Sequence, residues 1–274
     1  TGNFFSVLPE SMADSRLYGV EIEPISGHIA KHLYPDADIQ VTGFEHTSHP
    51  DQFFDVVIGN IPFNSIKVDD PRYNRYNFRI HDYFLAKSLD KTRPGGIVAV
   101  ITSKYTMDKA NSSNRRYLAQ RAELMGAIRL PNTAFKQVAG TEATTDILFL
   151  KKREREIVPD EANSPWLSVE QNADGIPMNT WFIDHPEMVL GKMVFDESVY
   201  GNEKSTACHP LPGDDLDERL ERAVSYLEGT YEEPEQEGDI PQAERAPEIK
   251  SIPADPAVRN FSYALADGNL YYRE

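Results

Sequence analysis

The sequence predicts an α/β protein built around a mostly parallel β-sheet that is covered by helices. In the first half of the chain, short strand-like segments alternate with segments whose apolar residues recur at helical spacing. Two of the strand-like segments, 53–58 and 97–101, are almost continuously apolar, which is typical of strands buried on both faces. At 274 residues the chain is long enough for one substantial core and a second, smaller unit.

The expected elements follow one another without long gaps. Residues 53–58 are β-branched, short and bounded by turn residues, and residues 80–90 place Tyr83, Phe84, Ala86 and Leu89 on one helical face. The full set of expected strands is 17–22, 39–41, 53–58, 97–101, 126–130 and 145–150, and the expected helices are 24–33, 80–90 and 114–124.

Four parts are expected along the chain. Residues 1–155 form the alternating α/β domain, and 156–228 form a small irregular appendage that ends in an acidic helix at 216–227. Residues 229–256 are rich in Glu and Pro, which favours a flexible acidic linker. Aromatic alternation around Asp267-Gly268-Asn269 predicts a hairpin in 257–274, the start of a further domain. Because the sequence opens on Thr1 in what looks like the middle of a motif, we expect a fragment of a longer protein.

Composition narrows the class of protein. One cysteine, Cys208, excludes a disulfide framework and a thiolate metal cluster, and it fits a reducing cytoplasm. No apolar run approaches the roughly 18 residues of a membrane span, so we expect no membrane partner. No set of side chains has an evident metal-ligand pattern, so no metal is expected.

The net charge of −16 is unevenly distributed. Residues 1–155 hold 20 Lys and Arg against 18 Asp and Glu, a net of +2, whereas residues 156–274 hold 8 against 26, a net of −18. Within the first part, residues 65–155 hold 18 against 9, a net of +9. Such a segment is typical of a surface that follows a phosphate backbone, and equally of solvated helix faces. Both interpretations stay open, although aromatic residues are interleaved with Lys67, Arg72, Arg75 and Arg79.

The tetrapeptide Asn60-Ile61-Pro62-Phe63 follows the expected strand 53–58, and open α/β sheets bind ligands at the carboxyl ends of their strands. Taken alone, the tetrapeptide is more typical of an ordinary strand-to-loop turn with an incidental Phe. In its context, the pattern suits methyl transfer to a planar amino group. The side-chain oxygen of Asn60 and the carbonyl of Ile61 accept the two N–H hydrogens and localise the lone pair of the amine. Pro62 fixes the turn, and Phe63 stacks on the planar substrate.

Candidate cofactor residues lie ahead of this turn. Thr1-Gly2-Asn3-Phe4 has the composition of the second half of a glycine-rich nucleotide loop. Glu21, at the end of the strand 17–22, has the position of a carboxylate that holds ribose hydroxyls, although a solvated carboxylate, like that of its neighbour Glu23, is the alternative. Phe44 and Glu45 follow the next strand, where they suit an adenine ring and its amino group or, equally, the core and the surface.

Together these segments resemble the S-adenosylmethionine-dependent N6-adenine DNA methyltransferases, over about residues 1–152. The order of the motifs is similar to that of type I modification subunits and fused restriction–modification enzymes. The stretches around His81-Asp82-Tyr83-Phe84, Ile101-Thr102-Ser103-Lys104 and Arg121-Ala122-Glu123-Leu124 are similar to methylase–helicase proteins of phages and mobile elements. The resemblance rests on Thr1-Gly2-Asn3-Phe4, Gly19-Val20-Glu21-Ile22, residues 54–63, Pro94-Gly95-Gly96 and Thr145-Asp146-Ile147-Leu148-Phe149.

The resemblance implies a Rossmann-like class I methyltransferase fold whose first strand, central in the sheet, lies before Thr1. It also implies S-adenosylmethionine as cofactor, double-stranded DNA as partner through the basic segment 65–155, and a helicase domain in the parent chain. The target adenine would be flipped out of the duplex and stacked on Phe63. The family usually has Pro where this chain has Ile61 and Tyr where it has Phe63. Because half of the cofactor loop would precede Thr1, we expect the fragment to bind cofactor poorly.

Two other functions remain open from the residues. A similar turn serves glutamine-amide methylation of proteins, since that amide is planar too. The chain is also compatible with a non-catalytic DNA-binding or scaffold module of a methylase–helicase protein.

Overall fold

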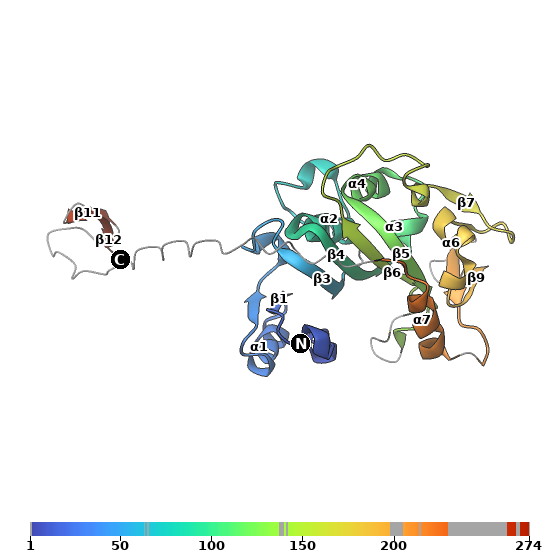
Figure 1. The fold of residues 1–274 in the computed structure, drawn as a ribbon, viewed down its shortest axis with the longest axis horizontal. Helices are drawn as coiled ribbons and strands as arrows, with labels where there is room; N and C mark the ends of the chain where they lie inside the picture. Colours follow the sequence, from blue (N-terminus) through green and yellow to red (C-terminus); the bar gives the residue numbers. More distant parts are fainter. Residues whose placement is uncertain are drawn as a thin grey trace. The chain divides into compact units, whose positions relative to one another are not determined.

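The computed structural model describes residues 2–62, 64, 66–136, 140, 142–197, 205–213, 215–229, 262–266 and 269–273. The chain divides into two compact units, Thr1–Glu232 and Glu233–Glu274 (Figure 1). The finer division into four parts that the sequence suggests stays a prediction, and the linker expected at 229–256 falls, apart from Gly229, on positions outside the described residues.

The larger unit is an α/β unit, as predicted. Its strands are β1 (Tyr18–Glu21), β2 (Asp38–Val41), β3 (Phe54–Asn60), β4 (Thr92–Ser103), β5 (Ala122–Leu130), β6 (Thr145–Lys152), β7 (Val169–Gln171), β8 (Pro177–Asn179), β9 (Lys192–Phe195) and β10 (Thr206–His209). Its helices are α1 (Pro24–Leu33), α2 (Ile80–Lys91), α3 (Tyr105–Asp108), α4 (Ser113–Arg121), α6 (Thr180–Asp184) and α7 (Leu216–Ser225).

The central sheet has four strands in the order β3-β4-β6-β5. β3 and β4 pair in parallel, whereas β6 pairs antiparallel with both β4 and β5. Three strands therefore run in one direction and β6 runs in the other, which confirms a mostly parallel sheet. The reversal of β6 could not be predicted, because an alternation of strands and helices carries no information on strand direction.

β1 and β2 form a separate parallel pair connected by α1. The amino ends of β1 and β3 lie close together, since the rings of Tyr18 and Phe54 are 5.3 Å apart between centroids. Among the described residues, the edge of β3 that faces away from β4 pairs with no strand. Val56 and Ile58, which share one face of β3, are 36% and 54% exposed. The additional central strand that the sequence analysis expects stays a prediction.

The core lies between the central sheet, its helices and the appendage. Leu85 and Leu89 of α2 are fully buried and belong to the same cluster as Val98 and Val100 of β4. The appendage contributes to this cluster rather than forming its own, through Trp166, Phe182, Met188 and Met193. This packing holds residues 164–195 firmly against the α/β part of the unit.

The predicted helix 114–124 is too long. The helix ends at Arg121, and Ala122 is already extended, with φ −143° and ψ 154°. Ala122 pairs with Lys152, and Leu124 pairs with Leu150 in β6. The apolar residues after Arg121 are buried by pairing in the sheet, and this tertiary contact outweighs the helical spacing of the sequence.

The predicted strand 97–101 is longer than expected, because β4 begins at Thr92 and includes Pro94-Gly95-Gly96. The register between β3 and β4 shifts between Phe54 and Val56, opposite this segment. Gly95 has φ +74°, a conformation that favours glycine. The three residues thus form an irregularity within the strand rather than a turn ahead of it.

The smaller unit contains the antiparallel hairpin β11 (Ser262–Ala266) and β12 (Asn269–Arg273), as the sequence predicted. Of the expected turn residues, Asp267 and Gly268 lie outside the described residues. In neither unit does a described helix have the length and apolar character needed to cross a membrane.

Candidate active site

Asn60 is the last residue of β3, and its backbone is paired with Ile101 of β4. Its side chain is exposed, as is that of Pro62. Phe63, the stacking residue of the prediction, lies outside the described residues. The structure therefore places the Asn60 amide at the open carboxyl end of a parallel strand, where α/β sheets bind ligands.

Ile61 fixes the backbone of the turn. Its side chain is 5% exposed and belongs to the main core cluster, and its N–H donates to the carbonyl of Ile101 at 3.1 Å. This bond extends the β3–β4 ladder by one residue. A proline, which the resembling family usually has at this position, has no N–H to donate.

The amino-terminal loop runs into two short 3₁₀ helices, Phe5–Val7 and Glu10–Met12. Gly2 has φ +80°, and a Cβ there would meet the ring of Tyr34 at 2.7 Å, so only glycine fits. The carbonyl of Asn3 accepts from the hydroxyl of Ser6 at 2.8 Å, and Phe4 is 36% exposed. Thr1, the remaining member of the predicted loop, lies outside the described residues.

Glu21, the candidate ribose carboxylate, and its neighbour Glu23 make different contacts in the structure. Glu23 is the N-cap of α1, where it accepts from the N–H groups of Ile25 at 3.0 Å and Ser26 at 2.6 Å. These backbone hydrogen bonds hold the pKa of Glu23 below its usual value. Glu21 ends β1 and is half-buried, and its Oε1 accepts from the N–H of Glu23 at 3.0 Å. Glu23 is therefore engaged in capping, and the assignment of Glu21 to a ribose stays a prediction.

Phe44 and Glu45 form part of a short 3₁₀ helix, Phe44–His46, after β2. The ring of Phe44 is half-buried against Phe84 of α2, with the centroids 4.9 Å apart. The ammonium of Lys87 lies 5.2 Å from the centroid of the Phe44 ring and donates to the carbonyl of Glu45 at 3.2 Å. The structure thus brings both residues against α2. Phe44 also packs against a second buried cluster, which consists of Tyr73, Phe78, Tyr83 and Ala86.

A buried ion pair anchors the loop that follows the Asn60 turn. Asp70 accepts from Lys87 at 3.0 Å and from the hydroxyl of Tyr83 at 2.9 Å, and all three residues are buried. Desolvation raises the pKa of Asp70, but hydrogen bonds from Lys87 and Tyr83 lower it, and the result lies below the usual value. This contact was not predicted, because Tyr83 and Lys87 are 13 and 17 residues from Asp70 along the chain. The only indication in the sequence is that both side chains are polar on a buried face of a helix.

Many cations of the basic segment 65–155 are engaged within the protein. Arg72 pairs with Asp51 at 2.5 Å and with Asp90 at 3.1 Å. Arg129 is fully buried and pairs with Asp146 at 2.8 Å and Asp108 at 2.7 Å. Other internally bonded cations are Lys91, Arg93, Lys104, Arg115, Arg121, Lys136 and Lys152. Much of this charge is therefore structural, a role that the sequence analysis did not consider.

Asp108 and Asp146 are held by Arg129, and in the described part of the chain no group of three or more His, Cys, Asp and Glu residues could hold a metal ion. Burial also lowers the pKa of Lys104, whose ammonium donates to the carbonyl and hydroxyl of Thr206. These contacts connect the end of β4 to β10 and so stabilise the appendage on the sheet.

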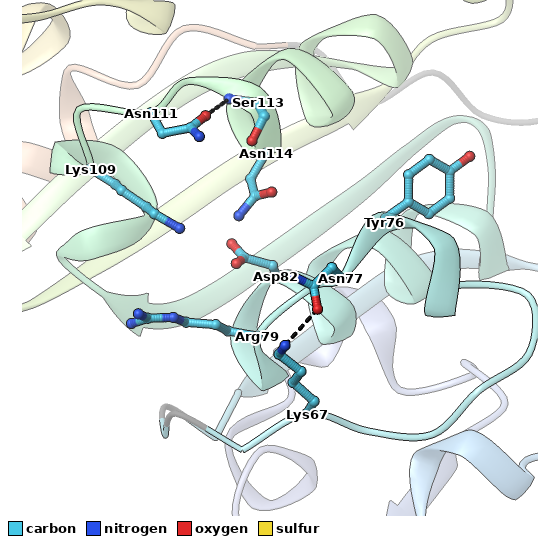
Figure 2. Close-up of a pocket in the computed structure, with 9 residues that line it drawn as sticks. All are labelled: Lys67, Tyr76, Asn77, Arg79, Asp82, Lys109, Asn111, Ser113 and Asn114. Carbon is cyan, nitrogen blue, oxygen red and sulfur yellow. Dashed lines mark hydrogen bonds between the residues drawn. The ribbon is translucent and has the colours of Figure 1, made fainter.

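A cavity of about 350 Å³ lies between the loop that follows β3, the first turn of α2, and the start of α4 with the segment ahead of it (Figure 2). Its walls include Arg79, Asp82, Lys109 and Asn114. From the sequence, the His81–Phe84 stretch contributed only to a resemblance, and this cavity was not predicted. The signal for it is Asp82, an acidic residue at a core-facing position of a helix.

Part of the chain, including the segment that carries Asn60, is similar to known proteins. Residues 34–135 match the model of the Eco57I restriction-modification methylase family. The chain is 33% identical over 144 residues to the protein named defense against restriction protein B of Escherichia phage P1, a match that covers 50% of this chain and 6% of that protein. The chain therefore spans only a small part of the curated relative it matches.

Two solved structures are similar at lower identity. One is described as a class I S-adenosylmethionine-dependent methyltransferase of Listeria monocytogenes, with 19% identity, coverage of 53% and 47% of the two chains, and a TM-score of 0.43. The other is described as a modification subunit of a type I restriction enzyme of Vibrio vulnificus YJ016, with 15% identity, coverage of 59% and 46%, and a TM-score of 0.43. Neither likeness bears on the substrate of this chain.

The family match contains β3, the Asn60 turn, the anchored loop and the cavity. Over residues 34–135 the chain is similar to the Eco57I restriction-modification methylases.

Proposed function

We propose that this chain is the methylase part of a site-specific DNA methyltransferase that transfers a methyl group from S-adenosylmethionine to N6 of adenine. The observation that supports this most is the exposed Asn60 side chain at the carboxyl end of β3, within a segment that matches a methylase family. The relative from phage P1 is named for defence against restriction, which suits methylation of DNA.

The residues of the turn have distinct tasks in this proposal. The Asn60 side-chain oxygen and the Ile61 carbonyl accept the two hydrogens of the exocyclic amine, and this raises the nucleophilicity of its nitrogen. The hydrogen bond from Ile61 to Ile101 holds the turn on the rigid sheet, so both acceptors are positioned before the substrate arrives. Phe63 stacks on the extrahelical adenine, whose release from the duplex costs a few kcal/mol.

The residues predicted to bind the cofactor are assigned to different parts of S-adenosylmethionine. Glu21 lies at the end of β1 with its carboxylate oriented by the N–H of Glu23, where it would hold ribose hydroxyls. Phe44 and Glu45 would flank the adenine ring, and Gly2, Asn3 and Phe4, with Thr1 before them, would line the remainder of the site. The sulfonium of the bound cofactor supplies the methyl group, and the protein residues align the amine with it.

Double-stranded DNA is the proposed partner, and a helicase domain elsewhere in the parent protein is a further proposal. We place the protein in the cytoplasm, where its DNA substrate and its single reduced cysteine are both expected.

The test uses the full-length protein, labelled S-adenosylmethionine and unmethylated duplex DNA, with nucleoside analysis of the product. We expect label in N6-methyladenine from the wild type, and a loss of at least about 100-fold in the Asn60→Ala variant. Asn163→Ala is the matched control, since Asn163 is an exposed asparagine in a turn of the appendage. That control is expected to retain the wild-type rate.

Other outcomes would point elsewhere. Label found on protein glutamine alone would replace the DNA proposal with amide methylation. Cofactor binding that is absent by calorimetry while DNA binding persists would leave a non-catalytic DNA-binding or scaffold module. Equal rates for Asn60→Ala and Asn163→Ala would remove Asn60 from the reaction.

A further inference from the structure

The cavity is lined by Asp82, and one oxygen of its carboxylate accepts no hydrogen bond from a described residue. The Asp82 side chain is 3% exposed and projects into the cavity, as Figure 2 shows. Within the described part of the chain, its buried Oδ2 has no hydrogen-bond donor. Nε2 of His81 lies 3.7 Å from this oxygen, which is too long for a hydrogen bond.

His81 does not compensate the carboxylate by charge either. Burial lowers the pKa of the His81 imidazole, so the ring is neutral at pH 7, although Asp82 acts in the opposite direction. A buried carboxylate without a donor costs free energy, and such groups in native proteins are usually satisfied by a ligand or water. A ligand with an N–H or O–H donor would therefore satisfy the Asp82 carboxylate.

Cations with unused donors surround the same cavity. The side chains of Arg79 and Lys109 have no hydrogen bond or ion pair with any described residue, and they line the wall beside Asp82 (Figure 2). Lys67 donates to Asn77 at 2.5 Å and completes the basic side. Guanidinium and ammonium groups in this arrangement suit a phosphate, and the adjacent Asn114 supplies an amide.

The remaining wall is aromatic and rigid. Tyr76 lines the cavity, is half-buried, and is stacked on Phe78 with the ring planes 14° apart. The guanidinium carbon of Arg75 lies 4.7 Å from the centroid of the Tyr76 ring, so the ring is already packed within the protein. The loop that carries Tyr76 is fixed by the Asp70–Lys87 ion pair. A volume of about 350 Å³ is within the range of small-molecule sites.

We propose that this cavity binds one nucleotide of the DNA strand, with its phosphate on Arg79 and Lys109 and an N–H of its base on Asp82. An ion alone would leave Asp82 without a donor, and an uncharged base alone would leave both cations unused. The DNA origin of the nucleotide rests on the proposed function, because a free nucleotide has the same chemistry. Asp82 orients the base in this proposal, since a carboxylate accepts an amino or imino hydrogen and every DNA base presents one.

The experiment measures binding to the full-length protein without cofactor, so that it does not depend on methyl transfer. The probes are the four deoxynucleoside monophosphates, inorganic phosphate, glycine and a fluorescein-labelled five-nucleotide single strand. The variants are Asp82→Asn and the double variant Arg79→Gln, Lys109→Gln. Arg116→Gln is the control, because Arg116 lies on α4 and donates to the carbonyl of Pro159 rather than lining the cavity.

We expect a nucleotide to bind at least tenfold more tightly than inorganic phosphate. Asp82→Asn is expected to weaken nucleotide binding about tenfold and to leave phosphate binding unchanged. The double variant is expected to weaken both, and Arg116→Gln neither. Thermal unfolding of each variant checks the fold, and the exposed Arg79 keeps the proposal testable if Asp82→Asn destabilises the protein.

Several results would overturn the proposal. One is that nucleotides bind with no higher affinity than inorganic phosphate. Another is that glycine binds with higher affinity than the nucleotides. The third is that a folded Asp82→Asn variant keeps the wild-type affinity for nucleotides. If the variants weaken mononucleotide binding but not strand binding, the ligand is a free nucleotide and the DNA assignment is wrong. Failure of the methylation assay with nucleotide binding intact would reject the proposed function and leave this site standing.

Discussion

The N–H of Ile61 donates to the carbonyl of Ile101 at 3.1 Å, one residue beyond the last paired position of β3 and β4. This single bond ties the proposed amine-accepting turn to the centre of the sheet. The Ile61 side chain is buried in the main core cluster, so the same residue anchors the turn twice. The backbone of Ile61 is therefore held against the β4 strand.

The first prediction tests this anchor. Replacing Ile61 with Pro removes the donor and several buried methyl and methylene contacts, so we expect a loss of about 2–4 kcal/mol in the free energy of unfolding. Ile61→Val keeps the N–H and is expected to cost about 0.5–1.5 kcal/mol. Chemical denaturation of both variants gives the comparison. Equal losses for Pro and Val would mean that the hydrogen bond contributes nothing.

The second prediction separates the two neighbouring glutamates. Glu21→Gln is expected to reduce S-adenosylmethionine affinity at least about tenfold with little change in Tm, since a ribose-binding carboxylate loses its charge. Glu23→Ala removes the N-cap of α1 and is expected to lower Tm by a few degrees, with a smaller effect on affinity. Calorimetric titration and thermal unfolding measure the two effects. The reverse assignment, with Glu23→Ala abolishing binding, would place the ribose on Glu23.

The third prediction concerns acid stability. The pKa of Asp70 is depressed in the folded protein, whereas an unfolded Asp titrates at about 3.9. A depressed pKa contributes stability above the unfolded value and loses it as the pH falls through the folded value. We therefore expect wild-type stability to fall below about pH 4, and the Asp70→Asn variant to fall less steeply there.

The same variant is informative at neutral pH. Asp70→Asn leaves the buried Lys87 without its counter-charge and is expected to cost about 3 kcal/mol at pH 7. Urea unfolding at pH 7 and pH 3.5 gives both numbers. A difference between variant and wild type that stays constant across this range would show that Asp70 does not titrate with folding.

Much of the fold follows from local pattern, and the exceptions have physical causes. Helix 24–33 was predicted with the bounds that α1 has, because Glu23 and Pro24 begin it and apolar spacing continues to Leu33. The helix predicted at 114–124 was too long because Leu124 is buried by pairing with Leu150, a contact between residues distant in the sequence. Strand direction also depends on tertiary contacts, which explains why the reversal of β6 was not predicted.

The candidate site shows the same limit. The position of Asn60 at a strand end follows from the apolar run before it, and the structure places it there. The distinction between Glu21 and Glu23 required the cap geometry, and the cavity around Asp82 required three segments that are separated in the sequence. Charge alone left the role of the basic segment open, since it cannot tell a cation on the surface from one held by an internal carboxylate, such as Arg129.

The last prediction uses this distinction to map DNA contacts. If Arg79 and Lys109 bind phosphate, each replacement by Gln should reduce the slope of log affinity against log salt by about one. Arg72 is paired with Asp51 and Asp90, so Arg72→Gln should leave the slope unchanged and lower Tm by a few degrees instead. Fluorescence anisotropy of a labelled duplex over a range of salt concentrations measures the slopes. An unchanged slope for Arg79→Gln and Lys109→Gln would exclude both residues from the phosphate contacts. A reduced slope for Arg72→Gln would show that DNA breaks the ion pairs of Arg72, so that the loop carrying it rearranges when DNA binds.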